Sequence, residues 1–307
     1  MNIVEWLLEG DVSTQYATHR YLLQSPESIW GPLRMRIANE GWGKQFLDSR
    51  SSNGHWGLHF YQPKWTSTHY TLLDLKHLGI DPNNPACREM VFRTFHECQK
   101  DDGSMNLSKY DHPSDIAVSG MVLQYGAYFC PKESSIKNLI DWLLSMQKED
   151  GRYEWEYDSP NSAPHTTLCV LEGLRECVLQ GIHHRVEEIL AVEKKGIDYL
   201  YNHHFFLDYP DRRYLQTTFP YRYRYNVLRG LEYLQSAHEP YDRGMEEALQ
   251  WLRHKQLEDG RWKLDAMHQG NLHFEQEKVR QPSRIITLKA KLIVGHFLSQ
   301  EILHSPQ

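Results

Sequence analysis

Apolar residues recur at intervals of three and four along much of this chain, in segments that polar stretches separate. This spacing places apolar side chains on one stripe of an α-helix, so it predicts helices rather than strands. The clearest segments share a frame in which Leu or Met usually stands four residues after the first position and an apolar residue usually follows three later. The first positions of this frame are Thr18, Thr71, Ala117, Thr167, Arg224 and Thr287. We expect the Leu or Met that stands four residues after each first position to be almost fully buried. These residues are Leu75, Met121, Leu171 and Leu228.

A second pattern precedes these segments and repeats about every 50 residues. Its strongest copies run from Trp142 to Tyr153 and from Trp251 to Trp262: an apolar helix ends at Gln, Asp-Gly follows, and an aromatic residue stands two positions after the Gly. Weaker copies lie at 98–103 and 46–56. Gly accepts the positive φ that helix ends and turns require. Each copy therefore predicts a helical hairpin, and an N-terminal pair brings the number to about six.

The second helix of each predicted hairpin is the more hydrophobic one, so we expect it to lie inside, with neighbours on both sides. Six such hairpins can stack as an open solenoid or close into a ring of inner and outer helices. Trp142 and Trp251 stand on first helices. We interpret them as outer anchors that pack against the next hairpin, not as ligand contacts.

The repeated Gln-x2-Asp-Gly-x-aromatic pattern, followed by a Thr-rich helix start, resembles the repeat of the terpenoid cyclase and protein prenyltransferase superfamily (squalene cyclase-like). The resemblance covers nearly the whole chain. It implies an all-α fold, an α/α toroid of about six helical hairpins, with residues 1–307 forming one domain. It also implies a central cavity, which we expect to be lined by aromatic side chains, since aromatic residues make up 12% of the chain.

Composition narrows the classes of protein that fit. The 34 basic and 40 acidic residues give a net charge of −6, so no basic field indicates nucleic-acid binding. No run approaches the ~18 apolar residues of a membrane span, and the first residues do not resemble a signal peptide. The five cysteines form no Cys-x2-Cys pair. Their odd number is typical of reduced thiols, which indicates a cytoplasmic protein.

A ring of polar residues is predicted two positions before each first residue of the frame. The ring consists of Tyr16, His69, Asp115, His165 and Arg222, with Ile285 or its neighbour Arg284 in the last hairpin. Equivalent positions of a closed ring would point into one shared space. The alternative is structural: Asp115 and Ser114 are residue types that cap helices, and a lone His is more often a core or surface residue than a catalyst.

The functional residues of the related families are not intact here. In squalene-type cyclases the proton donor is the middle Asp of an Asp-x-Asp-Asp-Thr-Ala run; Asp115 matches the last Asp of that run, and Ser114 stands at the donor position. A hydroxyl cannot protonate an alkene. In protein prenyltransferases, zinc is held by an Asp, a Cys two residues later and a His. Asp115 matches the Asp, but Ala117 replaces the Cys and Thr166 replaces the His, with His165 one residue earlier.

Three functions remain open from the sequence. In the first, His69, Asp115 and His165 bind a divalent metal such as Zn, Fe or Mn, since imidazole and carboxylate are ordinary ligands of these ions. In the second, the same three residues perform acid–base catalysis on an isoprenoid-like or anionic substrate, which Tyr16, Arg222 and Arg284 bind. In the third, the chain is a non-catalytic small-molecule binder or scaffold. The sequence leaves the substrate and the oligomeric state open.

Overall fold

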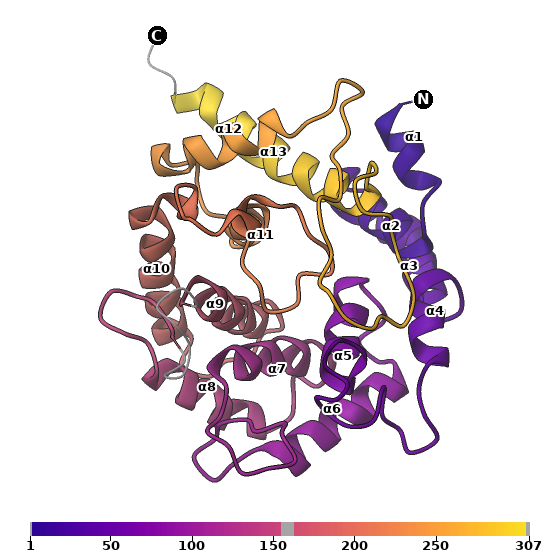
Figure 1. Cartoon of the computed structure of the whole chain (residues 1–307), viewed down its shortest axis with the longest axis vertical. Coiled ribbons are helices and arrows are strands. Elements are labelled where there is room, and N and C mark those ends of the chain that lie inside the picture. The colour runs from indigo at the N-terminus through magenta and orange to yellow at the C-terminus, as the bar shows by residue number, and fades with distance from the viewer. Residues whose placement is uncertain (1, 155–162, 305–307) are drawn as a thin grey trace.

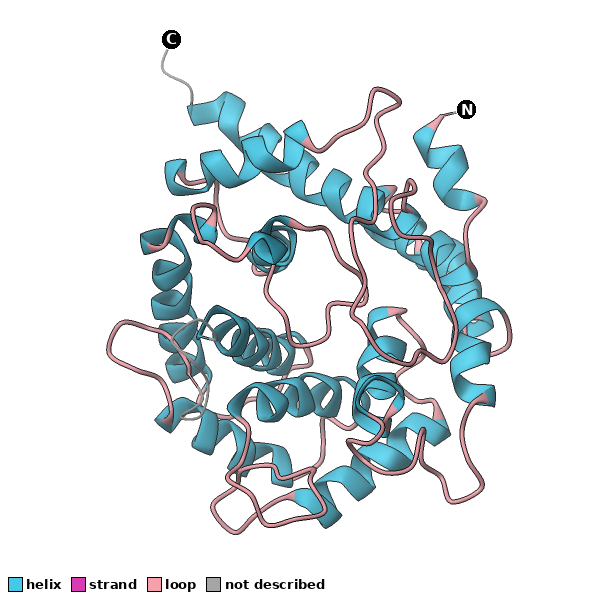
Figure 2. Ribbon diagram, viewed as in Figure 1, coloured by secondary structure: helices cyan, strands magenta, loops and turns pink. Residues whose placement is uncertain are grey.

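The computed structural model describes residues 2–154 and 163–304, with side chains through Phe297. Within these ranges the regular secondary structure is helical, and the only β-type pairings are isolated bridges such as that between Arg50 and Trp56 (Figure 2). The all-α prediction is therefore confirmed. None of the described helices is long and apolar enough to cross a membrane.

The helices form consecutive hairpins that follow one another around the molecule (Figure 1). The first helices of the hairpins are α1 (Ile3–Leu8), α3 (Glu27–Arg36) with α4 (Gly41–Asp48), α6 (Pro85–Cys98), α8 (Ser135–Ser145), α10 (Val186–Asn202) and α12 (Glu246–His254). The second helices are α2 (Val12–Ala17) with the π-turn Thr18–Leu22, α5 (Thr68–His77), α7 (Ile116–Phe129), α9 (Ala163–Leu179), α11 (Val227–Ser236) and α13 (Arg284–His304).

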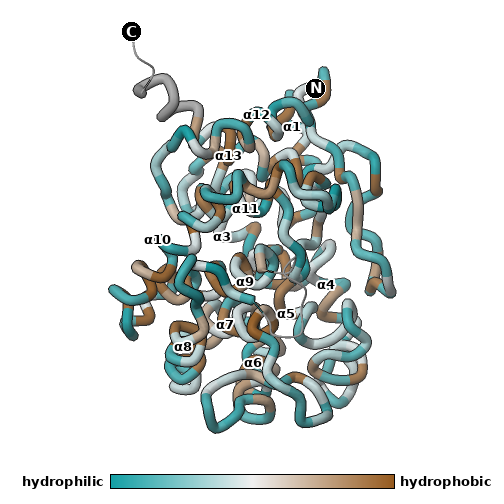
Figure 3. Tube along the Cα trace, turned by 60° about the vertical axis from the view of Figure 1, so that its left-hand side comes forward, coloured by the Kyte–Doolittle hydropathy of each residue, from teal (hydrophilic) through white to brown (hydrophobic). Residues whose placement is uncertain are grey.

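Burial separates the two sets as the hydrophobic pattern predicts. Every residue of α7 from Ile116 to Ala127 is buried, and so is every residue of α5 from Thr68 to Leu75. A first helix such as α8 buries one face only, and hydrophilic and hydrophobic positions alternate along its trace (Figure 3). The four expected core residues are each 0% exposed: Leu75, Met121, Leu171 and Leu228. Trp142 and Trp251 are partly buried on α8 and α12, where each packs against the core.

The turn after each first helix has one conformation in four hairpins. The Gly residues at 54, 103, 151 and 260 have φ between +80° and +90°. The Asp or Asn just before each Gly accepts a hydrogen bond from the backbone N–H two residues later, at 2.9–3.2 Å. A Gln one or two residues after the helix also contributes: the Nε2 of Gln99, Gln147 and Gln256 donates to the carbonyl of the turn Gly at 3.0–3.1 Å. The repeated motif is therefore a turn held by its own side chains.

The aromatic residue after the turn is joined to the start of the second helix by a threonine. The N–H groups of Trp56, Tyr153 and Trp262 donate to the hydroxyls of Thr68, Thr167 and Thr287, at 2.8–3.1 Å. This hydrogen bond shows which residues are equivalent: Thr68 of α5 has the role that Thr167 and Thr287 have in α9 and α13. The sequence frame placed Thr71 at this position and was therefore wrong in α5. The frame is also wrong at Arg224, because α11 begins only at Val227, with Asn226 as its N-cap.

Each turn packs on the first helix of the next hairpin. A Cβ on Gly103 would lie 2.5 Å from the carbonyl oxygen of Asn138 in α8, and one on Gly151 would lie 2.1 Å from that of Lys195 in α10. The last turn continues the series, since Gly260 packs against Ile3 of α1. The last helix α13 also contacts α1 and the π-turn that follows α2 (Figure 1). Residues near the end of the described chain therefore contact α1, here through the side chain of Ile3 and not through a backbone carbonyl.

The first prediction tests this close packing. Gly151→Ala should lower the free energy of unfolding by about 2–4 kcal/mol, because the new Cβ is strained at positive φ and also collides with the α10 backbone. Gly181 is the matched control: its φ is +69° and nothing lies within 4 Å of an added Cβ. Gly181→Ala should therefore cost about 1 kcal/mol, from strain alone. Urea unfolding of both variants measures the difference, and equal losses would contradict a tight contact between turn and helix.

Candidate functional site

Asp115 lines a cavity of about 570 Å³. The loop between α6 and α7 builds most of its wall, and Tyr61 from the loop before α5 completes it. The lining residues are Tyr61, Met105, Asn106, Leu107, Ser108, His112, Pro113, Asp115 and Val118. Asp115 is also the N-cap of α7, where its Oδ1 accepts a hydrogen bond from the N–H of Val118 at 3.0 Å. The helix-capping interpretation of Asp115 is therefore confirmed, and the same residue faces the cavity.

His69 lies inside the protein and is held as a neutral imidazole. It is 1% exposed, and burial, together with the charges of Arg222 and Lys64, lowers its pKa to about 3. Its Nδ1 lies 3.4 Å from the Tyr125 hydroxyl, and its Nε2 is buried with no hydrogen-bond partner among the described residues. Its ring centre lies 5.5 Å from that of Tyr61, which lines the Asp115 cavity, whereas His69 is not among the described lining residues.

His165 is neutral for a similar reason but has a defined hydrogen bond. Its Nδ1 accepts from the N–H of Tyr225 at 2.7 Å, which places the imidazole proton on Nε2. Burial and the nearby charges of Arg229 and Arg224 lower the pKa of His165 to about 3. The ring lines a small second cavity of about 40 Å³, which is separate from the Asp115 cavity.

The structure does not bring the predicted metal ligands together. His69 follows Thr68, whereas His165 precedes the equivalent Thr167 by two residues, so the two imidazoles stand at different positions of their helices. Within residues 2–154 and 163–304, no group of three His, Cys, Asp or Glu side chains could hold a metal ion. The predicted metal site assumed a common register for His69, Asp115 and His165, and the described helices do not have one.

The predicted substrate-binding residues lie apart from the Asp115 cavity. Arg222 is not helical but has φ +56° in the loop before α11. It is 3% exposed and its Nη1 forms an ion pair with Asp74 at 2.7 Å. Tyr16 is buried on α2, where its hydroxyl accepts from Arg20. Arg284 begins α13 and donates from Nε to the carbonyl of Trp6 at 2.8 Å.

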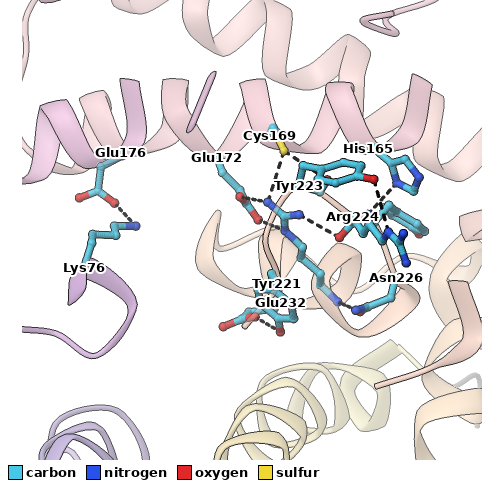
Figure 4. A network of polar contacts seen from close by, with 12 residues as sticks. Lys76, His165, Cys169, Glu172, Glu176, Tyr221, Tyr223, Arg224, Asn226 and Glu232 are labelled. Carbon is cyan, nitrogen blue, oxygen red and sulfur yellow. Dashed lines mark hydrogen bonds and ion pairs between the residues drawn. The ribbon is translucent and has the colours of Figure 1, made fainter. Parts of the chain in front are cut away.

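Sequence reasoning missed a network of ion pairs among the second helices (Figure 4). Arg229 of α11 is 1% exposed and donates to both carboxylate oxygens of Glu172 in α9, at 2.8 and 2.6 Å. Lys76 of α5 pairs with Glu176 of α9 at 2.8 Å. A further pair joins Lys289 of α13 to Glu232 of α11, and Arg175 of α9 pairs with Glu193 of the first helix α10. The signal in the sequence was the presence of charged residues within otherwise apolar helices. The interior thus contains paired charges in addition to buried aromatic side chains such as Tyr70, Tyr125 and Tyr221.

The pH dependence of stability tests the state of His165. A His whose pKa is lowered from 6.5 to about 3 stabilises the folded protein above pH 6.5, and this contribution is lost as the pH falls toward 3, since the unfolded chain takes up the proton first. His165→Asn keeps an acceptor in place of Nδ1 but cannot titrate. Between pH 7 and pH 5, the wild-type protein should lose about 2 kcal/mol more of its free energy of unfolding than the variant does. Urea unfolding at both pH values measures this, and identical losses would contradict a buried neutral His165.

Comparison with known proteins does not place the chain in a family. No family model matches the sequence. No curated protein matches it either.

Proposed function

We propose that this chain is an α/α toroid that binds a small, largely apolar molecule in the Asp115 cavity. The toroid is supported by the sequence of contacts between neighbouring hairpins and by the packing of the last turn, at Gly260, on α1. It is also the fold that the resemblance to the terpenoid cyclase and prenyltransferase repeat implies. Such a fold hosts many chemistries, so the function must be argued from the site.

The observation that carries the binding proposal is the cavity itself. Its volume of about 570 Å³ lies within the range of ~300–1,000 Å³ that is common for small-molecule sites. Met105, Leu107 and Val118 supply apolar wall, whereas Asp115 and the Tyr61 hydroxyl supply polar groups that could orient a ligand. A mostly apolar wall with a few polar groups is typical of binding pockets for small organic molecules.

The charges around the cavity favour a neutral or cationic ligand over an anionic one. None of the described residues that line it is Lys or Arg, and Asp115 adds a carboxylate. Arg222, which the sequence suggested as an anion ligand, already pairs with the buried Asp74. Of the two substrate classes considered from the sequence, the isoprenoid-like class therefore fits better than the anionic class.

A neutral fluorescent probe tests the binding proposal. N-phenyl-1-naphthylamine should bind saturably to the wild-type protein, with an increase in fluorescence. Ser108→Trp places a large side chain into the cavity wall and should weaken binding at least about tenfold, because the probe loses most of its buried apolar surface. Ser145→Trp is the control, since Ser145 is exposed on α8 and lies outside the cavity. Equal affinities for the two variants would place the probe elsewhere and contradict the proposal.

Acid–base catalysis on the bound molecule is the second candidate function. One observation favours it: Asp115 and Tyr61 line the same cavity. Burial and the negative charge of Asp115 raise the pKa of the Tyr61 hydroxyl well above its usual value, so Tyr61 keeps its proton at neutral pH. The Asp115 carboxylate could accept a proton from the bound molecule, and the Tyr61 hydroxyl could donate a hydrogen bond to the negative charge that forms.

Conversion of a neutral isoprenoid tests this second candidate. Farnesol is incubated with the protein, and products are followed by mass spectrometry. Asp115→Asn should slow conversion at least about 100-fold while N-phenyl-1-naphthylamine still binds. Asp111→Asn, on the same loop but with a side chain 91% exposed, should leave the rate unchanged. Conversion that survives Asp115→Asn, or wild-type protein that binds farnesol without converting it, would leave binding as the function.

A further inference from the structure

The ammonium group of Lys64 lies among three aromatic rings. Its Nζ is 4.7 Å from the ring centre of Tyr223, 4.9 Å from that of Trp65 and 5.9 Å from that of Tyr61. Cations within about 6 Å of a ring face are attracted by its negative π surface. The three rings come from the loop before α5 and the loop before α11. We call them the aromatic cage.

Contacts around the aromatic cage hold its rings in place. The planes of Trp65 and Tyr223 are nearly parallel, 12° apart, with ring centres 6.2 Å apart. The indole Nε1 of Trp65 donates to the carbonyl of Gln269 at 2.6 Å, and its ring packs edge-on against the buried Tyr70 at 4.9 Å. The ring of Tyr61 packs on that of Tyr70 at 5.7 Å. Contacts with Tyr70 and Gln269 therefore hold the rings of Trp65 and Tyr61 in place, and these contacts do not involve the cation.

Lys64 is poorly suited to be a permanent occupant of the cage. Its side chain is exposed, and no carboxylate of the described chain forms an ion pair with it. A lysine held in one place loses considerable rotamer freedom. Its primary ammonium is also strongly hydrated, so each contact with a ring costs hydrogen bonds to water. A cation without N–H groups would lose less hydration in the same place.

The aromatic cage borders the Asp115 cavity. Tyr61 belongs to both, since its ring faces Lys64 and it also lines the cavity wall. Tyr61 also accompanies Asp115 in the lining of this cavity, and burial together with the negative charge of Asp115 raises the pKa of Tyr61. A molecule could therefore place a charged end between the rings and an apolar end against Met105 and Leu107.

We propose that Tyr61, Trp65 and Tyr223 bind a small organic cation, a substituted ammonium with an apolar body, which displaces the Lys64 ammonium and extends into the Asp115 cavity. The inference rests on the proposed function, because the cavity holds the apolar part. It adds the class of ligand, because the π faces of the three rings attract positive charge. Two of these rings already lie near guanidinium groups, Trp65 near Arg222 and Tyr223 near Arg224, each at 5.8 Å. In the absence of the ligand, the Lys64 ammonium occupies the aromatic cage.

Two probes of equal shape separate charge from apolar contact. Phenyltrimethylammonium carries the cation, and tert-butylbenzene is its neutral counterpart. Their affinities for the full chain are compared by calorimetry and by displacement of N-phenyl-1-naphthylamine. The cation should bind at least about tenfold more tightly, as expected for a desolvated contact with several rings.

Variants of the cage then identify the binding place. Lys64→Met removes the competing ammonium and should raise the affinity for phenyltrimethylammonium about threefold to tenfold, a gain that poor folding cannot produce. Lys255→Met is the matched control: Lys255 lies over a single ring, that of Trp251 at 5.3 Å, and pairs with Asp265. Tyr223→Leu should weaken binding about tenfold, whereas Tyr223→Phe, which keeps the ring, should not. Melting temperatures confirm that each variant is folded.

The possible results distinguish this inference from the function on which it rests. Equal affinities for the two probes, with N-phenyl-1-naphthylamine still binding in the cavity, would overturn the cation site and leave the cavity as an apolar binding site. A preference for the cation that neither Lys64→Met nor Tyr223→Leu alters would place the cation elsewhere and also overturn the inference. If neither these probes nor the naphthylamine binds, both proposals fail.

Discussion

The arrangement of the helices depends on the close approach of each turn glycine to the first helix of the next hairpin. At Gly103 and Gly151 the partner is a backbone carbonyl, and a Cβ would lie within 2.5 Å of it. The Gln of the same turn donates to the next helix as well, from Gln99 to the carbonyl of Ser135 and from Gln147 to that of Val192. Backbone contacts of this kind allow little adjustment, because neither partner can move aside as a side chain can. They set the spacing of the hairpins and so decide how the second helices meet.

The second helices meet through charged as well as apolar side chains. Arg229 pairs with Glu172 between α11 and α9, and Arg222 pairs with Asp74 of α5. Removing such charges from water costs several kcal/mol per ion, which pairing and additional hydrogen bonds must offset. Arg229 meets this condition, since it also donates to the carbonyl of Arg224. Removing one side chain of a pair would leave the other charge buried without a partner. These pairs therefore constrain the relative positions of the helices. They also fill space between the helices, and the Asp115 cavity lies instead at the loop before α7.

The features that suggest function are on loops, whereas the repeat supports the scaffold. The loop between α6 and α7 builds most of the cavity, the loop before α5 carries Tyr61 and Trp65, and the loop before α11 carries Tyr223. Loops on a rigid scaffold commonly carry binding groups, since they can vary while the scaffold keeps its contacts. In this chain the turn, the Gln and the Thr are shared by several hairpins, whereas each loop brings different side chains. A proposed ligand site between two loops is consistent with this division.

The sequence by itself determined the helical class, the buried stripe and the turns, because these follow from local rules. Helical periodicity places Leu75 and Met121 on a buried face wherever the helix lies, and Asp-Gly or Asn-Gly takes the same turn in each copy. The sequence did not determine which residues line the candidate site. The register of a polar residue depends on where its helix begins, and α5 is fixed at Thr68 by a hydrogen bond to Trp56 that the frame could not reveal. Ion pairs and ring contacts depend on partners far away in the chain, as for Arg222 with Asp74 and Lys64 with Tyr223. Only the packing of the hairpins brings such residues within reach of each other, so the cavity and the aromatic cage were decided by the tertiary structure.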